Sequence, residues 1–175
     1  GKVVGVFGYG RIGKRVCALA QAFGAKPLVW GRTSSLEQAK QDGYAVADSK
    51  EAFFQHSDIV NLQLRLNDET RGIVTAADLA LMKPTAILVN ASRAELIESG
   101  ALEAALVKGR PGYAAVDVYE SEPILGANHP LLQLPNCLCT PHIGFVEREN
   151  YESYFGIAFD NINAYQAGTP QNQVI

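Results

Sequence analysis

Short apolar runs of strand length alternate with helix-like segments along most of this chain. The apolar runs cover residues 3–7, 28–30, 59–64, 86–90, 113–117 and 137–140. The segments between them that are typical of helices cover residues 11–23, 35–41, 49–55, 75–81 and 99–108. Strands that alternate with helices form a parallel sheet with right-handed crossovers. The sequence therefore predicts an α/β domain with a doubly wound parallel sheet.

A long amphipathic helix is predicted at the carboxyl end, over residues 146–167. Its larger apolar side chains lie on or near one stripe, and they are Tyr151, Phe155, Phe159, Ile162 and Tyr165. The Pro- and Gly-marked stretch at 120–135 is predicted to be a long surface loop rather than a domain boundary. Because 175 residues suffice for one sizeable core, residues 1–175 are predicted to form a single domain.

The composition argues against several classes of partner and site. A net charge of −3 gives no indication of binding to nucleic acid or to an anionic membrane surface. The apolar runs are far shorter than the roughly 20 residues that span a bilayer. We expect the chain to begin with a strand rather than with a signal peptide. We expect Cys17, Cys137 and Cys139 to be free thiols in a reducing cytoplasm. No metal site is expected, because Cys137 and Cys139 are expected to alternate across a strand.

A glycine pattern follows the first predicted strand and opens the first predicted helix. Residues 8–13 read GYGRIG, which fits the G-x-G-x-x-G pattern of a dinucleotide-binding loop in this context. Gly8 permits a tight turn, Gly10 lets the backbone approach a pyrophosphate, and Gly13 lets helix and strand pack closely. The helix start, with Arg11 and Ile12, offers N–H groups and a positive dipole end to the anion. A Rossmann domain is therefore predicted, although such a turn could also serve only the strand–helix junction.

The end of the second predicted strand decides which dinucleotide is expected. An acidic residue usually binds the ribose hydroxyls of NAD at this point, but the chain reads Trp30-Gly31-Arg32-Thr33-Ser34. Arg32 supplies a guanidinium that matches a phosphate, and Thr33 and Ser34 add hydroxyl donors. NADP(H) is therefore favoured over NAD(H), unless Arg32 is only a solvated loop charge.

Three polar residues follow later strand-like runs: Arg93, Glu122 and His142. Residues just beyond the carboxyl ends of parallel strands converge on one crevice, where ligands bind. A guanidinium, an acid and an imidazole at such positions are typical of a reaction centre. Together with the glycine loop they indicate hydride-transfer chemistry.

The chain resembles the cofactor-binding domain of the D-isomer-specific 2-hydroxyacid dehydrogenases. Five segments carry the resemblance in the family's order and cover nearly the whole chain. They are GYGRIG at 8–13, NDETRGI at 67–73, MKPTAILVNASR at 82–93, AVDVYESEP at 115–123 and TPHIG at 140–144. The resemblance implies an oxidoreductase that interconverts a 2-oxo acid and a D-2-hydroxy acid with NAD(P)(H).

The resemblance also implies a role for each of the three polar residues. His142 would protonate the carbonyl oxygen as hydride arrives, a task that suits an imidazole. Glu122 would hydrogen-bond and orient that imidazole. Arg93 would hold the substrate carboxylate with a two-pronged geometry that lysine cannot copy.

Further residues are implied to contact the cofactor. Asp117 would hold the nicotinamide carboxamide, and Ala91, His142 and Gly144 would line the cofactor site. The chain departs from the family pattern at Ala94, where glycine is usual after the arginine, and at Arg65, near which the family tends to have proline. The resemblance therefore implies either a phosphoglycerate dehydrogenase or a glyoxylate/hydroxypyruvate reductase, and these departures do not decide which substrate is used.

Members of the family also carry a smaller substrate domain that this chain is expected to lack. The chain begins at the glycine-loop strand and ends at Val174-Ile175, so we expect an excised domain or a processed fragment. Since the substrate of family members lies between two domains whose closure excludes water, the isolated chain is expected to turn over substrate poorly.

Two further expectations concern assembly and an alternative function. A homodimer is expected to form through this domain. The alternative function is that of a dinucleotide-sensing interaction protein, like the corepressors that share the fold.

Overall fold

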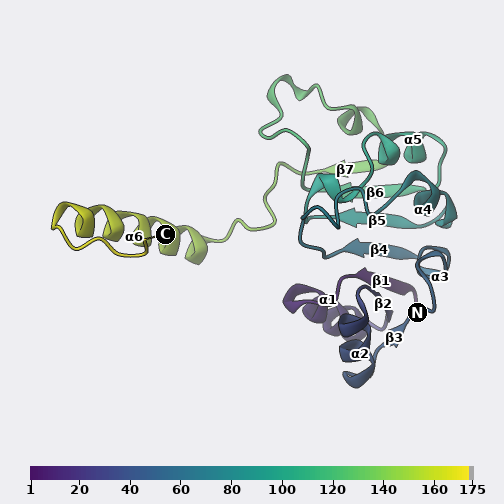
Figure 1. Ribbon diagram of the computed structural model, residues 1–175. Coiled ribbons are helices and arrows are strands. Elements are labelled where there is room, and N and C mark those ends of the chain that lie inside the picture. The colour runs from purple at the N-terminus through teal and green to yellow at the C-terminus, as the bar shows by residue number, and fades with distance from the viewer. Residues whose placement is uncertain (174–175) are drawn as a thin grey trace. The chain divides into compact units, whose positions relative to one another are not determined.

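The computed structural model describes residues 1–173 of the chain, which separate into two compact units. The unit Gly1–His142 holds a seven-stranded sheet and its helices, and the unit that starts at Ile143 holds one long helix (Figure 1). A single domain over residues 1–175 stays a prediction, and Val174 and Ile175 lie outside the described residues.

The sheet confirms the prediction of a doubly wound α/β fold. Its strands run in the order β3-β2-β1-β4-β5-β6-β7, and every neighbouring pair is parallel. The strands are β1 (Val3–Phe7), β2 (Lys26–Trp30), β3 (Ala45–Val46), β4 (Ile59–Leu62), β5 (Ile87–Asn90), β6 (Tyr113–Val116) and β7 (Cys137–Cys139). The chain order reverses between β1 and β4, and ligands of such sheets bind at the carboxyl ends near this reversal.

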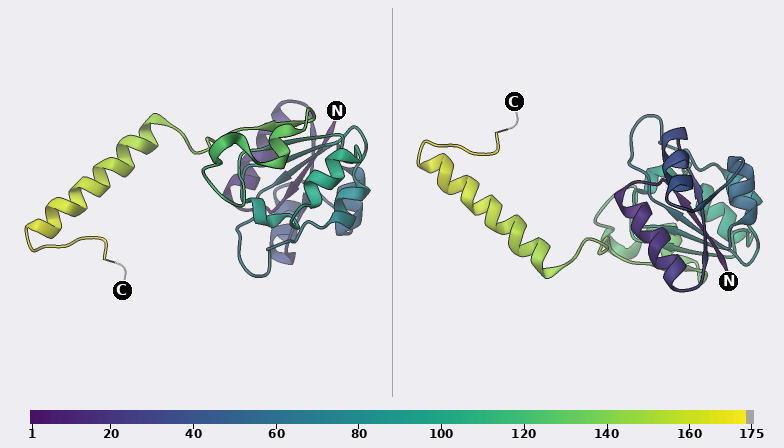
Figure 2. Two further views of the ribbon diagram at one scale, coloured as in Figure 1. Left: turned by 90° about the horizontal axis from the view of Figure 1, so that it is seen from above. Right: turned by 90° about the horizontal axis from the view of Figure 1, so that it is seen from below.

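Helices cover both faces of the sheet (Figure 2). The α-helices are α1 (Arg11–Ala22), α2 (Thr33–Gln41), α3 (Lys50–His56), α4 (Ala76–Leu81), α5 (Ala101–Val107) and α6 (Arg148–Gln166). Three short 3-10 helices are η1 (Ala94–Leu96), η2 (Leu125–Ala127) and η3 (Pro130–Gln133). None of the helices in the part of the chain that the structure describes could cross a membrane.

The sheet separates two hydrophobic clusters because successive strand residues point to opposite faces. Phe7 of β1 packs with Phe53 and Phe54 of α3 in the larger cluster, which extends under α4 and α5. Val6 of β1 packs in the smaller cluster with residues of α1 and α2, such as Cys17. The larger cluster supports the strands that lead to Arg93, and the smaller one supports the glycine loop.

On the face of the sheet that α1 and α2 cover, the strands β6 and β7 are more exposed to solvent. Tyr113 of β6 is 56% exposed and Leu138 of β7 is 67% exposed, whereas Ala114 and Val116 of β6 are buried in the larger cluster on the other face. Ala115 pairs with Leu138 in the sheet and is half-buried. Parallel sheets normally have both faces covered, so this surface is a candidate contact area.

The long helix α6 is confirmed within two residues of each predicted end. Its apolar side chains are exposed, and the largest are Tyr151, Tyr154, Phe155, Phe159, Ile162 and Tyr165. The segment after α6 turns back on itself, where the Asn172 side chain donates to Asn161.

Three local predictions need correction. The strand β3 was missed, because two residues form no apolar run. The helix α2 starts at Thr33 rather than at residue 35, and neither Ser34 nor Ser35 caps it. The Arg32 carbonyl already accepts from the backbone N–H groups of Ser35 and Leu36, so the helix begins directly after the strand. The predicted loop at 120–135 contains η2 and η3.

The two cysteines of β7 do not point apart. Their sulfur atoms lie 3.7 Å from one another, because residues two apart on a strand share a face. All three cysteines are free thiols. Burial raises the pKa of the Cys17 thiol to about 11, and burial together with Cys139 raises that of Cys137 to about 12. Thiols with such pKa values react slowly near neutral pH.

Asp58 ties together the amino ends of three strands, at the edge opposite the glycine loop. Its carboxylate accepts from the Val3 backbone N–H at 2.8 Å and from the Lys83 ammonium at 2.9 Å. Lys83 also donates to the His56 carbonyl at 2.8 Å. The Val3 N–H and the Lys83 ammonium together lower the pKa of Asp58 below its ordinary value.

We predict that Asp58→Asn destabilises the fold by about 1–3 kcal/mol at pH 7, because a charge-assisted pair is lost. A lowered carboxyl pKa contributes stability above the unfolded value of 3.8, and that stability is lost as the pH falls through the folded value. Urea unfolding of both proteins from pH 7 to pH 3 should therefore show their difference shrinking below about pH 4. Asp68→Asn, at an exposed residue, is the control; a constant difference across the pH range would contradict the prediction.

Candidate functional site

The glycine loop lies between β1 and α1, at the centre of the carboxyl edge of the sheet. Gly8 has a φ of +102°, and a Cβ there would lie 2.4 Å from the Gln63 carbonyl oxygen. A Cβ on Gly13 would lie 2.1 Å from the Gly8 carbonyl oxygen, so α1 could not pack this closely on β1 with any other residue. A Cβ on Gly10 would meet no atom within 4 Å, so the space beside it is open for a ligand.

The amino end of α1 can accept an anion. Gly10 is its N-cap and offers no side-chain hydrogen bond, and no acidic residue lies in the first turn. Helix starts of this kind bind phosphate through their N–H groups and dipole. The residues present therefore fit the pyrophosphate of a dinucleotide.

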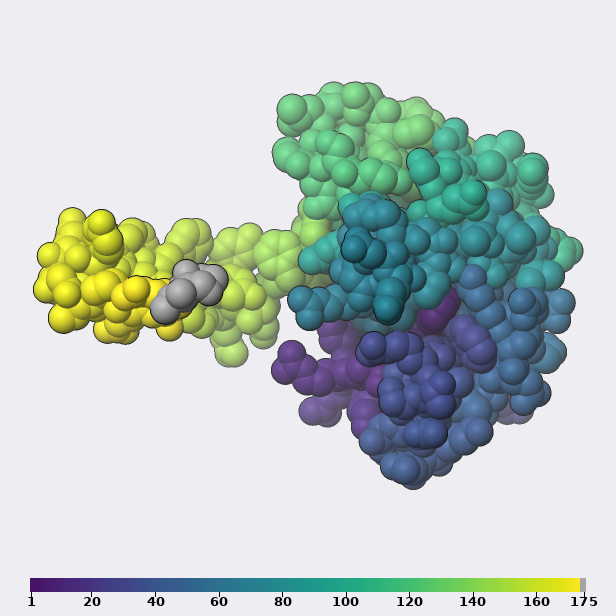
Figure 3. Space-filling view, in the orientation of Figure 1, coloured from purple at the N-terminus to yellow at the C-terminus, as the bar shows by residue number. Residues whose placement is uncertain are grey.

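Two cavities lie along this edge of the sheet. The first, of about 470 Å³, is called the phosphate cavity, and its lining consists of residues 10–13, 63–66 and 91–93. It brings Arg11, Ile12 and Ala91 together with Arg93, as the sequence predicted for a shared site. In the space-filling view the amino-terminal segments (purple and blue) lie against teal segments from the middle of the chain (Figure 3).

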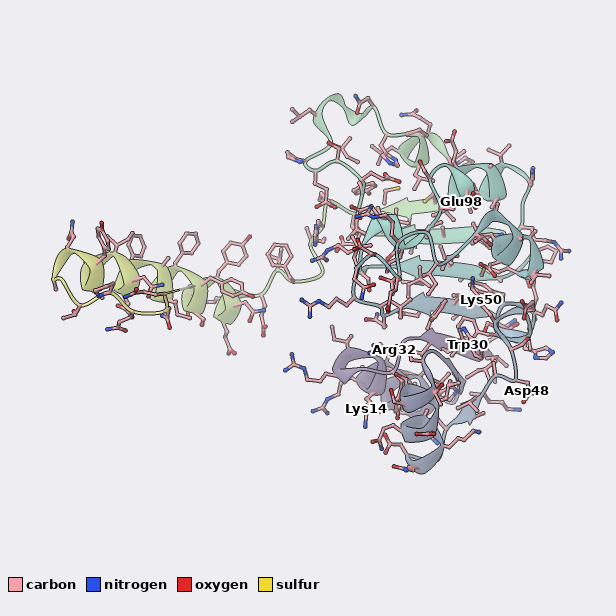
Figure 4. The ribbon with its side chains drawn as sticks, in the orientation of Figure 1. Lys14, Trp30, Arg32, Asp48, Lys50 and Glu98 are labelled. Atoms are coloured by element: carbon pink, nitrogen blue, oxygen red, sulfur yellow. The ribbon has the colours of Figure 1, made fainter. Side chains whose placement is uncertain are left out.

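The second cavity, of about 430 Å³, is called the adenosine cavity because it lies at the end of β2. Its lining includes Trp30, Gly31 and Arg32 from the end of β2, and Leu64 and Arg65 after β4 (Figure 4 labels Trp30 and Arg32). A Cβ on Gly31 would make only an ordinary 3.5 Å contact with Ser35. Packing therefore leaves room for a Cβ at this position.

The predicted hydroxyl donors lie outside both cavities. Thr33 and Ser34 form the exposed first turn of α2, directly after Arg32. Of the three residues predicted to bind a 2′-phosphate, the adenosine cavity includes Arg32 alone.

Arg93 is held at the edge of β5 by a turn that its neighbours fix. The buried Asn90 side chain donates to the Arg93 carbonyl at 2.8 Å and accepts from the Ser92 N–H at 3.1 Å. The Ser92 hydroxyl donates to the Leu62 carbonyl at 2.8 Å, which ties the turn to β4. The backbone of Arg93 is therefore fixed, and its exposed guanidinium donates to the Ser92 carbonyl at 2.6 Å.

His142 and Glu122 form a direct pair, as predicted. The His142 Nδ1 lies 2.5 Å from a Glu122 carboxylate oxygen, and the other oxygen accepts from the Tyr119 backbone N–H at 2.8 Å. Burial works to raise the pKa of Glu122, but these two hydrogen bonds and the nearby charges of His142 and Arg93 lower it overall. Glu122 is therefore held as a carboxylate that fixes the Nδ1 side of the His142 ring.

The segment before His142 is anchored on β6 and on Tyr119. The Tyr119 hydroxyl donates to the Thr140 carbonyl at 3.1 Å, and the Thr140 hydroxyl donates to the buried Asp117 carboxylate at 2.5 Å. His142 itself has a φ of +54°. This left-handed conformation is uncommon outside glycine and is typical of functional positions.

The structure brings most of the predicted residues to one edge, and two supporting residues were missed. Gly144 belongs to the second unit, so its place relative to the cavities is not defined. Asn90 was missed although an Asn two residues before a Ser is typical of a turn that bonds its own backbone. Tyr119 was missed because its partners, Glu122 and Thr140, are identified only by the fold.

Three proteins to which this chain is similar are named as reductases or dehydrogenases. A glyoxylate reductase from Aeropyrum pernix is 40% identical over 175 residues, which are 99% of this chain and 52% of that protein. A crystal structure from Ralstonia solanacearum, provisionally named a D-3-phosphoglycerate dehydrogenase, has 57% identity and a TM-score of 0.92 over 98% of this chain and 50% of its own. An acyclic imino acid reductase in complex with NADPH and D-Arg has 29% identity and a TM-score of 0.77 over 99% of this chain and 55% of its own.

The chain therefore spans about half the length of the relatives that it matches. Residues 1–144 match the family model described as D-isomer specific 2-hydroxyacid dehydrogenase, NAD binding domain. The fold, the glycine loop and the order of the segments agree with that match. This chain belongs to the D-isomer-specific 2-hydroxyacid dehydrogenase family and forms its NAD-binding domain.

Proposed function

We propose that this chain is the cofactor-binding and catalytic half of an oxidoreductase that interconverts a 2-oxo acid and a D-2-hydroxy acid. The observation that carries the proposal is the hydrogen-bonded pair of His142 and Glu122. The positive charge of Arg93 is near enough to contribute to the lowered pKa of Glu122. His142 and Arg93 follow β7 and β5 at the edge of the sheet that holds the glycine loop, which supports an acid/base role for His142 and a carboxylate-binding role for Arg93. The named activities of the relatives, glyoxylate reduction and phosphoglycerate dehydrogenation, both act on acids of this class.

Each side chain has a distinct task in the proposed reaction. A bound nicotinamide dinucleotide would supply or accept the hydride. His142 donates a proton from Nε2 to the substrate's carbonyl oxygen during reduction and removes it from the hydroxyl during oxidation. Glu122 keeps the ring in the orientation that presents Nε2 and stabilises its protonated form. Arg93 holds the substrate carboxylate and so fixes the carbonyl beside His142.

The test of this proposal is the loss of rate in the whole protein when His142 is replaced. His142→Gln should lower kcat with glyoxylate or hydroxypyruvate by about 10²–10⁴-fold, the usual contribution of general acid–base catalysis. His56→Gln removes an imidazole at the end of α3, far from this edge in the fold, and should leave kcat unchanged. Unaltered kcat in His142→Gln would refute the assigned role.

We further propose that the cofactor is NADP(H). The proposal is supported by the absence of an acid at the end of β2 and by Arg32, which lines the adenosine cavity. A guanidinium favours the 2′-phosphate of NADP(H), whereas the missing carboxylate would have served the ribose hydroxyls of NAD(H).

Arg32→Ala should weaken NADPH binding by roughly 10- to 100-fold, the range for a charge-assisted hydrogen bond, and should leave NADH binding unchanged. Titration calorimetry with both dinucleotides measures the two affinities. Lys26→Ala, which removes a cation from the start of the same strand, is the control. Equal affinities for NADPH and NADH in the unaltered protein would contradict the proposed preference.

A homodimer in the cytoplasm is the remaining part of the proposal. The exposed Tyr113 and Leu138 mark a sheet face that α1 and α2 leave open, and a second copy of the chain would cover it. A reducing cytoplasm suits the three free thiols.

Leu138→Asp should convert the dimer to a monomer, because a charge would be buried at the contact. Light scattering behind a sizing column measures the mass. Val107→Asp is the matched control, since Val107 is 70% exposed on α5, which packs on the other face of the sheet. A monomeric unaltered protein at high concentration would contradict this assignment.

A further inference from the structure

Arg65 lines both cavities, in a position that the proposed roles leave unassigned. It follows β4 by three residues and is exposed. We propose that Arg65 binds the adenosine 2′-phosphate of NADP(H) together with Arg32, so that the two guanidinium groups form a clamp across the glycine loop. This inference rests on the proposed binding of NADP(H) and adds a second residue that determines cofactor choice.

The sheet topology places the two arginines on either side of the loop. Phe7 of β1 pairs with Trp30 of β2 on one side and with Leu62 of β4 on the other. Adjacent strands lie about 4.8 Å apart, so the ends of β2 and β4 are separated by roughly 10 Å. Arg32 lies two residues beyond the first end and Arg65 three residues beyond the second. Both residues line the adenosine cavity.

The backbone of Arg65 is fixed by a network within its own loop. The Thr70 hydroxyl donates to the Arg65 carbonyl at 2.7 Å and accepts from the Asn67 N–H at 2.9 Å. The Asn67 side chain in turn accepts from the N–H groups of Glu69 and Thr70, at 3.1 and 3.0 Å. A loop that is already ordered loses little entropy when it binds a ligand. Arg65 is therefore presented on a rigid turn.

The charges around the adenosine cavity favour a phosphate. Lys50 also lines the cavity, but its ammonium is taken up by Asp78 at 2.5 Å and by the Ile73 carbonyl. Arg32 and Arg65 have no ion-pair partner among residues 1–173, and Glu69 is the acid in the lining. Two available guanidinium groups against one carboxylate leave a positive excess, which complements a phosphate monoester of charge about −1.5 to −2.

The competing role for Arg65 is contact with the pyrophosphate, since Arg65 also lines the phosphate cavity. The start of α1 already supplies N–H groups and a dipole there, and both dinucleotides carry the pyrophosphate. A pyrophosphate contact would therefore strengthen NADPH and NADH equally, whereas a 2′-phosphate contact would strengthen NADPH alone. The two roles predict different affinity patterns.

The experiment measures NADPH and NADH affinities for the unaltered protein, Arg65→Ala, Arg32→Ala and the double variant. Trp30 is the only tryptophan of the chain and lines the adenosine cavity, so its fluorescence reports occupancy; calorimetry gives an independent value. Arg65→Ala should weaken NADPH binding by roughly 10- to 100-fold and change NADH binding by less than about twofold. The double variant should lose less than the product of the single losses, because both groups contact one phosphate.

Two further variants sharpen the result. Arg71→Ala removes a guanidinium that lies near Glu95 and lines neither cavity, and it should bind NADPH normally. Arg65→Lys keeps the charge without the two-pronged geometry and should lie between the alanine variant and the unaltered protein. Circular dichroism verifies that each variant is folded.

Three outcomes would overturn the inference in distinguishable ways. Equal losses for NADPH and NADH in Arg65→Ala would assign Arg65 to the pyrophosphate. Normal affinities in Arg65→Ala, with a selective loss in Arg32→Ala, would leave the proposed NADP(H) binding intact and remove Arg65 from it. An unaltered protein that binds neither dinucleotide would overturn the proposed function and this inference with it.

Discussion

The close approach of α1 to β1 at Gly8 and Gly13 is the constraint on which the rest of the site depends. Because a side chain on Gly13 would overlap the Gly8 carbonyl, only this pair of glycines lets the helix start directly over the strand end. The helix start then faces the phosphate cavity, which places the N–H groups and dipole beside the space at Gly10. The cavities, the arginines around them and the proposed cofactor geometry all follow from that junction.

The reacting groups are arranged by a different kind of interaction. Asn90 fixes the turn of Arg93, and Tyr119 contacts both Glu122 and the segment that leads to His142. Most of these bonds join a side chain to a backbone atom, so they hold the position of the chain rather than the functional side chain itself. The exposed guanidinium of Arg93 makes a bond of the same kind, since it donates to the Ser92 carbonyl at 2.6 Å.

The sequence predicted every strand except β3 because the strands depend on local pattern, and the catalytic roles of the three polar residues stay a prediction. Apolar runs define the strands, and parallel strands necessarily bring their carboxyl ends to one edge, so Arg93, Glu122 and His142 could be grouped without a structure. The start of α2 was predicted two residues too late, because the Arg32 carbonyl at the end of the strand already accepts the first helical hydrogen bonds. The role of Tyr119 could not be predicted from the sequence, because its hydroxyl comes within hydrogen-bonding distance of the Thr140 carbonyl only when β6 and β7 pair in the fold.

The separation of the hydrophobic interior into two clusters has a consequence for how such a domain can evolve. Residues that support the end of β2 and α2, such as Val29 and Ala39, belong to the smaller cluster. Those that support β5 and the turn before Arg93, such as Leu88 and Leu96, belong to the larger one. Phe7, Trp30 and Leu64, which line the adenosine cavity, also pack in or against the larger cluster. A substitution that repacks this cavity therefore also affects the packing that supports the turn before Arg93, whereas a substitution at Ala39 of α2 acts on the smaller cluster alone. Changes on the α2 side are thus the ones that selection can accumulate without disturbing that turn.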